Sequence, residues 1–144
     1  MEVVIGSDHG GKDLKDALAR WMESRGVAFE DVGTDSTESV DYPDFAEKVV
    51  RTVLDGTARL GVLVCGTGIG MSIAANRHRG IRAALCTSSY MARMARAHND
   101  ANVLCLGGRV IGPGEAADVL QAFLEGEFEG GRHVRRLGKI DPAK

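Results

Sequence analysis

The chain has 144 residues, of which 44% are hydrophobic and 26% charged, and its formal net charge at pH 7 is -2. This length predicts a single domain over residues 1–144, and the small net charge argues against a nucleic-acid partner or a membrane surface. No apolar run approaches the roughly 18 residues that a membrane span needs, and the N-terminus lacks the features of a signal peptide. We therefore expect a cytoplasmic protein.

Short apolar runs alternate with amphipathic segments along the chain. Strands are predicted at 3–5, 27–32, 60–65, 81–86 and 103–106. Helices are predicted from the spacing of apolar residues before Gly26, over 45–54, from near Met71, over 91–98 and over 113–124. The segment 33–43 is polar and loop-like, and the tail from Gly130 is basic.

This alternation predicts an α/β fold, namely a three-layer α/β/α Rossmann-like domain with a five-stranded parallel sheet and a basic C-terminal tail. Right-handed crossovers bring the carboxyl ends of all strands to one edge, where such folds bind ligands. The residues that directly follow the strands are therefore the candidates for a site. They fall at 7–11, 65–70, 87–89 and 107–109.

The segment Cys65-Gly66-Thr67-Gly68-Ile69-Gly70 carries three glycines at alternate positions before a predicted helix. Such a loop can aim its N–H groups at an anion, and three glycines beside a thiol favour this interpretation over a tight turn without a ligand. The segment lacks the lysine of a Walker loop, and Met71 stands where the dinucleotide fingerprint needs a glycine. The loop therefore does not indicate NAD or ATP binding.

The three cysteines, Cys65, Cys86 and Cys105, do not have the spacing of a disulfide framework or a zinc site. We expect Cys86 and Cys105 to be small buried hydrophobic residues. Cys65 differs because it ends a strand against the glycine loop. There a thiolate could take a proton from carbon beside a carbonyl group, and the loop N–H groups could stabilise the resulting enediolate.

Two further features concern charge. Arg132 and Arg136 are four residues apart, so on a helix they share a face that suits a phosphate, and Arg109 at the carboxyl edge supports this interpretation over a solvated charge run. His98 ends an apolar stripe formed with Met91, Met94 and Ala95, and a core or capping role is the simpler alternative. The helix that carries His98 should end opposite Cys65. We therefore hypothesise that His98 acts across the interface of a two-fold dimer.

The sequence resembles the type B ribose-5-phosphate isomerases nearly from end to end. The matching segments are Ser7-Asp8-His9-Gly10-Gly11, Asp41-Tyr42-Pro43, Cys65 to Asn76, His98-Asn99-Asp100-Ala101-Asn102-Val103 and Glu129-Gly130-Gly131-Arg132-His133. One branch of the family places a carboxylate just after the glycine loop. Met71 stands there in this chain, which therefore resembles the branch that uses cysteine.

The resemblance implies interconversion of ribose 5-phosphate and ribulose 5-phosphate through a cis-enediolate, with no metal or other cofactor. It implies that Cys65 moves the proton between C2 and C1, that His98 assists ring opening and that Thr67 relays protons between hydroxyls. The remaining roles that it implies are substrate contacts near the ring and phosphate by Asp8 and His9, an anion hole from Gly66, Thr67, Gly68, Ile69 and Gly70, a hydroxyl contact by Asn99, and a phosphate grip by Arg109, Arg132 and Arg136.

The resemblance also implies a homodimer, or a dimer of dimers, whose active sites are shared between subunits. Three alternatives stay open. The substrate could be a six-carbon sugar phosphate, such as allose 6-phosphate or galactose 6-phosphate. The chain could instead be a nucleotide- or phosphate-binding module without turnover, because this fold class hosts many of them. A metal-dependent isomerase is disfavoured because no His/Asp/Glu cluster has ligand spacing along the sequence.

Overall fold

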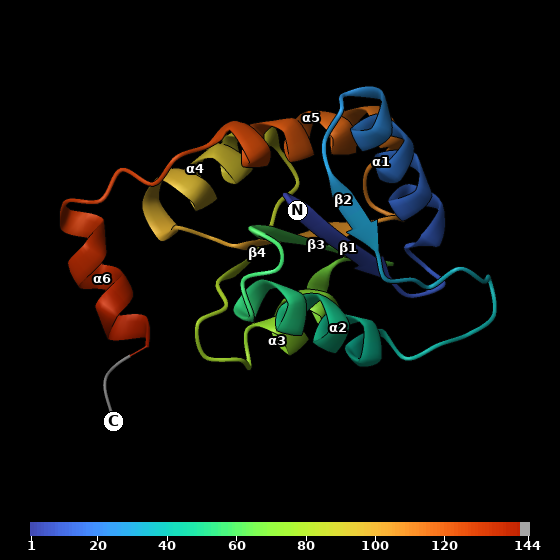
Figure 1. The fold of residues 1–144 in the computed structure, drawn as a ribbon, viewed down its shortest axis with the longest axis horizontal. Helices are drawn as coiled ribbons and strands as arrows, with labels where there is room; N and C mark the ends of the chain where they lie inside the picture. The colour runs from blue at the N-terminus through green and yellow to red at the C-terminus, as the bar shows by residue number, and fades with distance from the viewer. Residues whose placement is uncertain (142–144) are drawn as a thin grey trace.

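A parallel sheet with helices on both faces forms the body of the protein (Figure 1). The computed structural model describes residues 1–141, and these residues form five strands in the order β2-β1-β3-β5-β4. The strands are β1 (Val3–Ser7), β2 (Phe29–Asp31), β3 (Leu60–Cys65), β4 (Ala83–Leu85) and β5 (Val103–Gly107). The helices are α1 (Lys12–Ser24), α2 (Tyr42–Leu54), α3 (Ile69–Ala75), α4 (Ser89–Asn99), α5 (Pro113–Glu125) and α6 (Arg132–Ile140). The predicted Rossmann-like architecture is confirmed.

Two apolar clusters fill the space between the sheet and its covering helices. Figure 1 shows α1, α4 and α5 over one face and α2 and α3 over the other. Alternate residues of β3 enter opposite clusters, so that Val62 packs beneath the first helix layer and Leu63 beneath the second. Because both faces are covered, β3 is buried along its whole length, which explains its continuous apolar run.

The two outermost strands are shorter than predicted. β2 covers Phe29–Asp31 of the predicted 27–32, and β4 covers Ala83–Leu85 of the predicted 81–86. Each pairs with a single neighbour, and beyond the paired residues only isolated backbone hydrogen bonds continue, such as those from Val32 N–H to the Ile5 carbonyl and from Cys86 N–H to the Cys105 carbonyl. The helix predicted from near Met71 begins earlier, at Ile69, so Ile69 and Gly70 belong to the first turn of α3 rather than to the glycine loop.

The predicted apolar stripe of α4 is wrong in part. Met91 is 42% exposed and His98 is half-buried, whereas the buried side of the helix is made of small residues and one arginine: Ala92, Ala95, Arg96 and Ala97. Arg96 is buried because its guanidinium Nη1 donates to the carbonyl of Ala101 and pairs with the Asp100 carboxylate. The long stem and the paired charge together let Arg96 lie on the buried side of the helix, which the hydrophobic pattern did not predict.

Gly11 brings the start of α1 against β3, and we expect Gly11→Ala to lower the free energy of unfolding by about 2–3 kcal/mol. A Cβ at Gly11 would lie 2.4 Å from the carbonyl oxygen of Val64, which is fixed backbone in a buried strand. The backbone angles of Gly11, φ -104° and ψ -2°, suit alanine, so the effect is steric alone. Urea denaturation measures the change.

Gly114→Ala is the matched control. Gly114 lies in α5, and a Cβ there meets nothing within 4 Å. Alanine is the better helix former by up to about 1 kcal/mol, so this variant should keep or gain stability. Equal stability of the two variants would contradict the steric argument.

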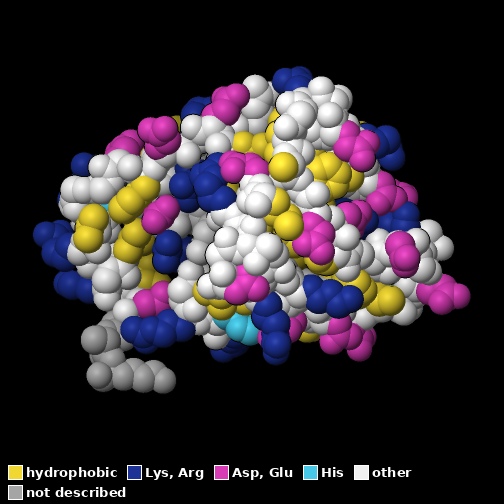
Figure 2. Space-filling view, viewed as in Figure 1, with side chains coloured by type: hydrophobic (Ala, Val, Ile, Leu, Met, Phe, Trp, Pro, Cys, Tyr) yellow, Lys and Arg dark blue, Asp and Glu magenta, His cyan; other side chains and the backbone are white. Residues whose placement is uncertain are grey.

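The C-terminal helix α6 stands apart from the three layers, at the end of the molecule near the start of β4 (Figure 1). The carbonyl of Asp141, just after α6, accepts from Arg79, and the Asp141 carboxylate accepts from the Gly80 N–H at 3.4 Å. Val134 and Ile140 of α6 are 57% and 59% exposed. Figure 2 shows apolar side chains gathered in this region of the surface. Among residues 1–141 there is no helix long and apolar enough to cross a membrane.

Candidate active site

Three adjacent strands end together at the carboxyl edge of the sheet. The register pairs Ser7 with Val64 and Cys65 with Gly107, so the segments that follow β1, β3 and β5 lie side by side. Backbone bonds join these segments: Gly108 N–H donates to the Cys65 carbonyl at 2.8 Å, and Arg109 N–H donates to the Gly66 carbonyl at 2.9 Å. This arrangement gathers the four side chains that we call the carboxyl-edge cluster: Asp8, His9, Cys65 and Arg109.

Cys65 lies at the rim of the core, with a 5% exposed side chain. Its Sγ accepts the Gly68 N–H at 3.1 Å. Gly68 can aim its N–H in this way because it adopts the left-handed conformation, with φ 81°, and a Cβ there would lie 3.0 Å from the Leu106 carbonyl oxygen. An N–H that donates to sulfur is placed to stabilise negative charge on it.

Cys86 and Cys105 are both buried, as predicted. Burial raises the pKa of the Cys86 thiol to about 11. Burial also raises the pKa of Cys105, and the neighbouring thiols Cys65 and Cys86 add to this rise. Both residues therefore stay protonated near neutral pH. Among the three cysteines, the structure gives Cys65 alone a donor that stabilises a thiolate.

The side chains of His9 and Asp8 are fixed by backbone N–H groups. His9 Nδ1 accepts from the Val40 N–H at 3.1 Å, and Asp8 Oδ1 accepts from the Gly11 N–H at 3.0 Å. Because Nδ1 of His9 is an acceptor, its ring proton belongs on Nε2, which is left to donate. The bond to Val40 comes from the loop 33–41, so this loop positions an imidazole donor at the carboxyl edge.

Arg109 lies across two glycines of the same edge. A Cβ on Gly66 would come 3.1 Å from Arg109 Nη1, and a Cβ on Gly10 would come 3.4 Å from Nη2. The guanidinium therefore lies close to the backbone of both loops, more tightly at Gly66 than at Gly10. Within residues 1–141, no acidic side chain forms an ion pair with Arg109, and the residue is exposed. Its charge is thus available to an anionic ligand.

The glycine loop itself is tighter than predicted. Of the expected five-residue anion hole from Gly66 to Gly70, Gly68 donates to Cys65 Sγ, and Ile69 N–H donates to Thr67 Oγ1 at 3.2 Å. Those two N–H groups are therefore engaged within the loop. Tyr42 lies against Gly70, where a Cβ would come 2.7 Å from the ring. Thr67 is exposed at the centre of the turn.

A second group of predicted residues lies near the amino edge. His98 ends α4, and its ring stacks on that of His133 with centroids 4.4 Å apart. Glu129 Oε1 lies 3.8 Å from His98 Nε2 and 3.7 Å from His133 Nε2. We call His98, Glu129 and His133 the imidazole cluster. Burial lowers the pKa of His133, and the charges of His98 and Arg132 act in the same direction.

Sequence reasoning missed this cluster, because the absence of ligand spacing along the sequence does not exclude a cluster that forms on folding. Within residues 1–141, the ligand atoms of His98, Glu129 and His133 all lie within 4.8 Å of one another. Spacing could not reveal the cluster because His98 and Glu129 are distant in sequence. They meet because the Glu129 N–H donates to the Ala97 carbonyl at 3.0 Å.

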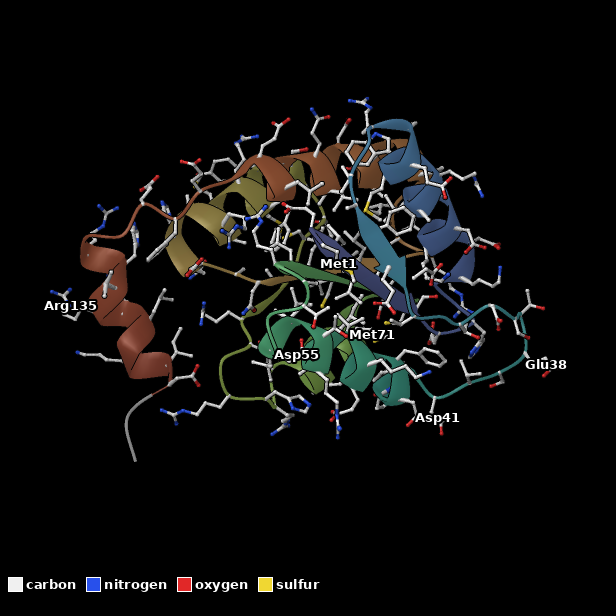
Figure 3. The ribbon with its side chains drawn as sticks, viewed as in Figure 1. Met1, Glu38, Asp41, Asp55, Met71 and Arg135 are labelled. Atoms are coloured by element: carbon white, nitrogen blue, oxygen red, sulfur yellow. The ribbon has the colours of Figure 1, made fainter. Side chains whose placement is uncertain are left out.

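The predicted site residues thus form two groups that do not meet within one chain. Asn99, Arg132 and Arg136 accompany the imidazole cluster, with Asn99 held near β4 because its carbonyl accepts from Arg82 Nε at 2.9 Å. In Figure 3, Arg135 of α6 lies at the opposite end of the molecule from Glu38 and Asp41, which flank Val40. The expected grip of Arg109, Arg132 and Arg136 on one phosphate is therefore not formed within one chain. Asp8, His9, Thr67 and Arg109 remain with Cys65.

Comparison with known proteins gives matches over almost the whole chain. Residues 3–140 match the model of the Ribose/Galactose Isomerase family. Ribose-5-phosphate isomerase B of Escherichia coli is 44% identical over 96% of this chain and 93% of its own length. D-erythrulose-4-phosphate isomerase of Pectobacterium atrosepticum is 42% identical over 97% and 93%. The crystal structure of a ribose 5-phosphate isomerase from Thermotoga maritima superimposes with a TM-score of 0.97 at 53% identity, covering 99% of this chain and 98% of the other.

Proposed function

Because this chain belongs to the ribose/galactose isomerase family and is an aldose–ketose isomerase acting on a sugar phosphate, we propose that it interconverts ribose 5-phosphate and ribulose 5-phosphate. The observation that carries this proposal is the pairing of Cys65 Sγ with the Gly68 N–H, next to the unpaired guanidinium of Arg109. A base and an anion contact thereby lie at one strand end, as proton transfer beside a carbonyl requires.

In the proposed reaction, Cys65 thiolate takes the proton from C2 of the open-chain aldose. The electrons of that C–H bond form the C1=C2 double bond, and the negative charge passes to O1. A proton then moves from O2 to O1, for which Thr67 is the proposed relay, and the Cys65 thiol returns its proton to C1. N–H groups of the glycine loop that are not engaged within it stabilise the enediolate.

The other predicted contacts divide between two chains in this proposal. Asp8, His9 and Arg109 bind the sugar phosphate from the chain that supplies Cys65. His98, which would assist ring opening, comes with Asn99, Arg132 and Arg136 from a second copy. Two observations support a shared site. These groups lie at opposite edges of one chain, and α6 exposes Val134 and Ile140, of which Ile140 lines a cavity of about 410 Å³ together with Asn99. A two-fold dimer would complete two sites at once.

Arg109→Met is expected to raise the KM for ribose 5-phosphate by about 10- to 100-fold and to lower kcat much less. A charge-assisted contact to phosphate contributes about 1.5–3 kcal/mol, and methionine keeps the unbranched stem that lies over Gly66. Steady-state kinetics of purified variants measure both constants. The control is Arg51→Met, which removes an exposed arginine that pairs with Glu47 away from the site. An equal KM in both variants would contradict the role of Arg109.

A panel of substrates tests the proposed function. Conversion of ribose 5-phosphate, allose 6-phosphate, galactose 6-phosphate and erythrulose 4-phosphate is measured with a chelator present. We expect the highest kcat/KM for ribose 5-phosphate. A higher value for another sugar would reassign the substrate and keep the isomerase chemistry. Loss of all activity in the chelator would contradict a reaction that needs no metal.

A further inference from the structure

His133 has a buried ring nitrogen that nothing in the described chain satisfies. The side chain is 6% exposed, and its Nε2 has no hydrogen-bond partner within residues 1–141. The nitrogen faces Glu129 Oε1 at 3.7 Å, beyond hydrogen-bond range, and the same oxygen lies 3.8 Å from His98 Nε2. A buried polar atom left without a partner is costly, so its position indicates that something else engages it.

We propose that His98, Glu129 and His133 bind a divalent transition-metal ion, with Zn²⁺ as the representative ion, and that the bound ion inhibits the enzyme. Two imidazole nitrogens and a carboxylate oxygen are a ligand set that Zn²⁺ accepts, with further positions left to water. The three ligand atoms already lie within 4.8 Å of one another. Glu129 is 56% exposed and can move toward a metal. The His98 side chain is 36% exposed, and it must turn out of its stack on His133 for both Nε2 atoms to face one ion.

Inhibition follows from the identity of one ligand, and this step rests on the proposed function. The Nε2 of His98 cannot hold a metal ion and exchange a proton with the sugar ring at the same time. The metal would therefore block ring opening rather than assist catalysis. Arg132 and Arg136, on the same helix as His133, oppose a further positive charge, so we expect micromolar rather than tighter affinity.

Calorimetric titration of the full-length protein with Zn²⁺ tests the site without any turnover. We expect one ion per chain in the wild type and affinity at least about tenfold weaker in both Glu129→Gln and His133→Gln. Glu129→Gln alters an exposed side chain and should fold normally, so it still tests the site if His133→Gln, a change at a buried residue, disturbs the fold. His78→Gln is the matched control, because it removes another histidine that lies 3.0 Å from a glutamate, Glu47.

A further control separates this site from the thiol, because Zn²⁺ also binds cysteine. Cys65→Ala should keep the wild-type affinity for Zn²⁺. Unchanged affinity in both Glu129→Gln and His133→Gln would overturn the proposal, as would loss of binding in Cys65→Ala or His78→Gln alone.

The consequence for activity is measured as the Zn²⁺ concentration that halves the isomerisation rate of ribose 5-phosphate. Each variant is compared with its own metal-free rate. We expect that a chelator restores the wild-type rate and that Glu129→Gln requires at least about tenfold more Zn²⁺. Binding at the site without isomerase activity would count against the proposed function and leave the site standing. Isomerase activity without Zn²⁺ binding would count against the metal site and leave the proposed function standing.

Discussion

Replacement of Cys65 by alanine is expected to lower kcat for ribose 5-phosphate by about 10³- to 10⁴-fold, while the protein still binds the sugar phosphate. The change removes the proposed proton carrier, and general acid–base catalysis is typically worth up to about 10⁴-fold. The proposed phosphate contacts of Arg109 and His9 do not involve the sulfur. Kinetics give kcat, and calorimetric titration with ribose 5-phosphate gives the affinity.

Cys86→Ala is the control, because it also removes a thiol but one that burial keeps protonated, with a pKa of about 11. Cys86 lies in the core cluster on the opposite face of the sheet from Cys65, so its loss costs some packing and should leave kcat within a few-fold. If Cys65→Ala kept more than a tenth of the wild-type kcat, the proton carrier would have to be another group.

Two inactive variants are expected to restore each other when they are mixed. Cys65→Ala and His98→Gln damage opposite edges of the chain, and each leaves intact the group that the other lacks. If a site takes Cys65 from one chain and His98 from its partner, a mixed dimer has one site with both groups and one with neither. Random re-assembly of equal amounts should then restore about one quarter of the wild-type activity.

The measurement requires proof that the chains have exchanged. Each variant therefore carries a different affinity tag, and the protein that holds both tags is purified before the assay. We expect this mixed species to have about half of the wild-type activity per dimer. A purified mixed dimer without activity would contradict a shared site and would mean that each site takes Cys65 and His98 from the same chain.

The sequence predicted the parts of the fold that depend on burial on both sides. β1, β3 and β5 are the three central strands, and their continuous apolar runs place the segments after Ser7, Cys65 and Gly107 at one edge. For that reason the sequence alone predicts the members of the carboxyl-edge cluster: Asp8, His9, Cys65 and Arg109. The edge strands β2 and β4 were predicted too long. Each pairs with one neighbouring strand, and an apolar run does not reveal how many of its residues join that pairing.

The imidazole cluster could not be predicted from spacing or periodicity. Its formation depends on the chain between α5 and α6 passing close to the end of α4, where Glu129 N–H meets the Ala97 carbonyl. The predicted buried stripe of α4, Met91, Met94, Ala95 and His98, was right for Ala95 only, and Ala92, Ala97 and the paired guanidinium of Arg96 complete the buried side. The first miss concerns groups that are distant in the sequence, whereas Arg96 finds its partners, Asp100 and Ala101, within five residues.

The most direct test of the central claim follows the hydrogen on C2 of the substrate. Ribose 5-phosphate deuterated at C2 is incubated with the wild-type enzyme, and NMR locates the deuterium over time. Proton abstraction by Cys65 predicts that ribulose 5-phosphate forms, with the deuterium moved to C1 or released to water, and that Cys65→Ala leaves it in place. Deuterium that stays on C2 while the wild type binds the sugar would contradict the isomerase proposed here.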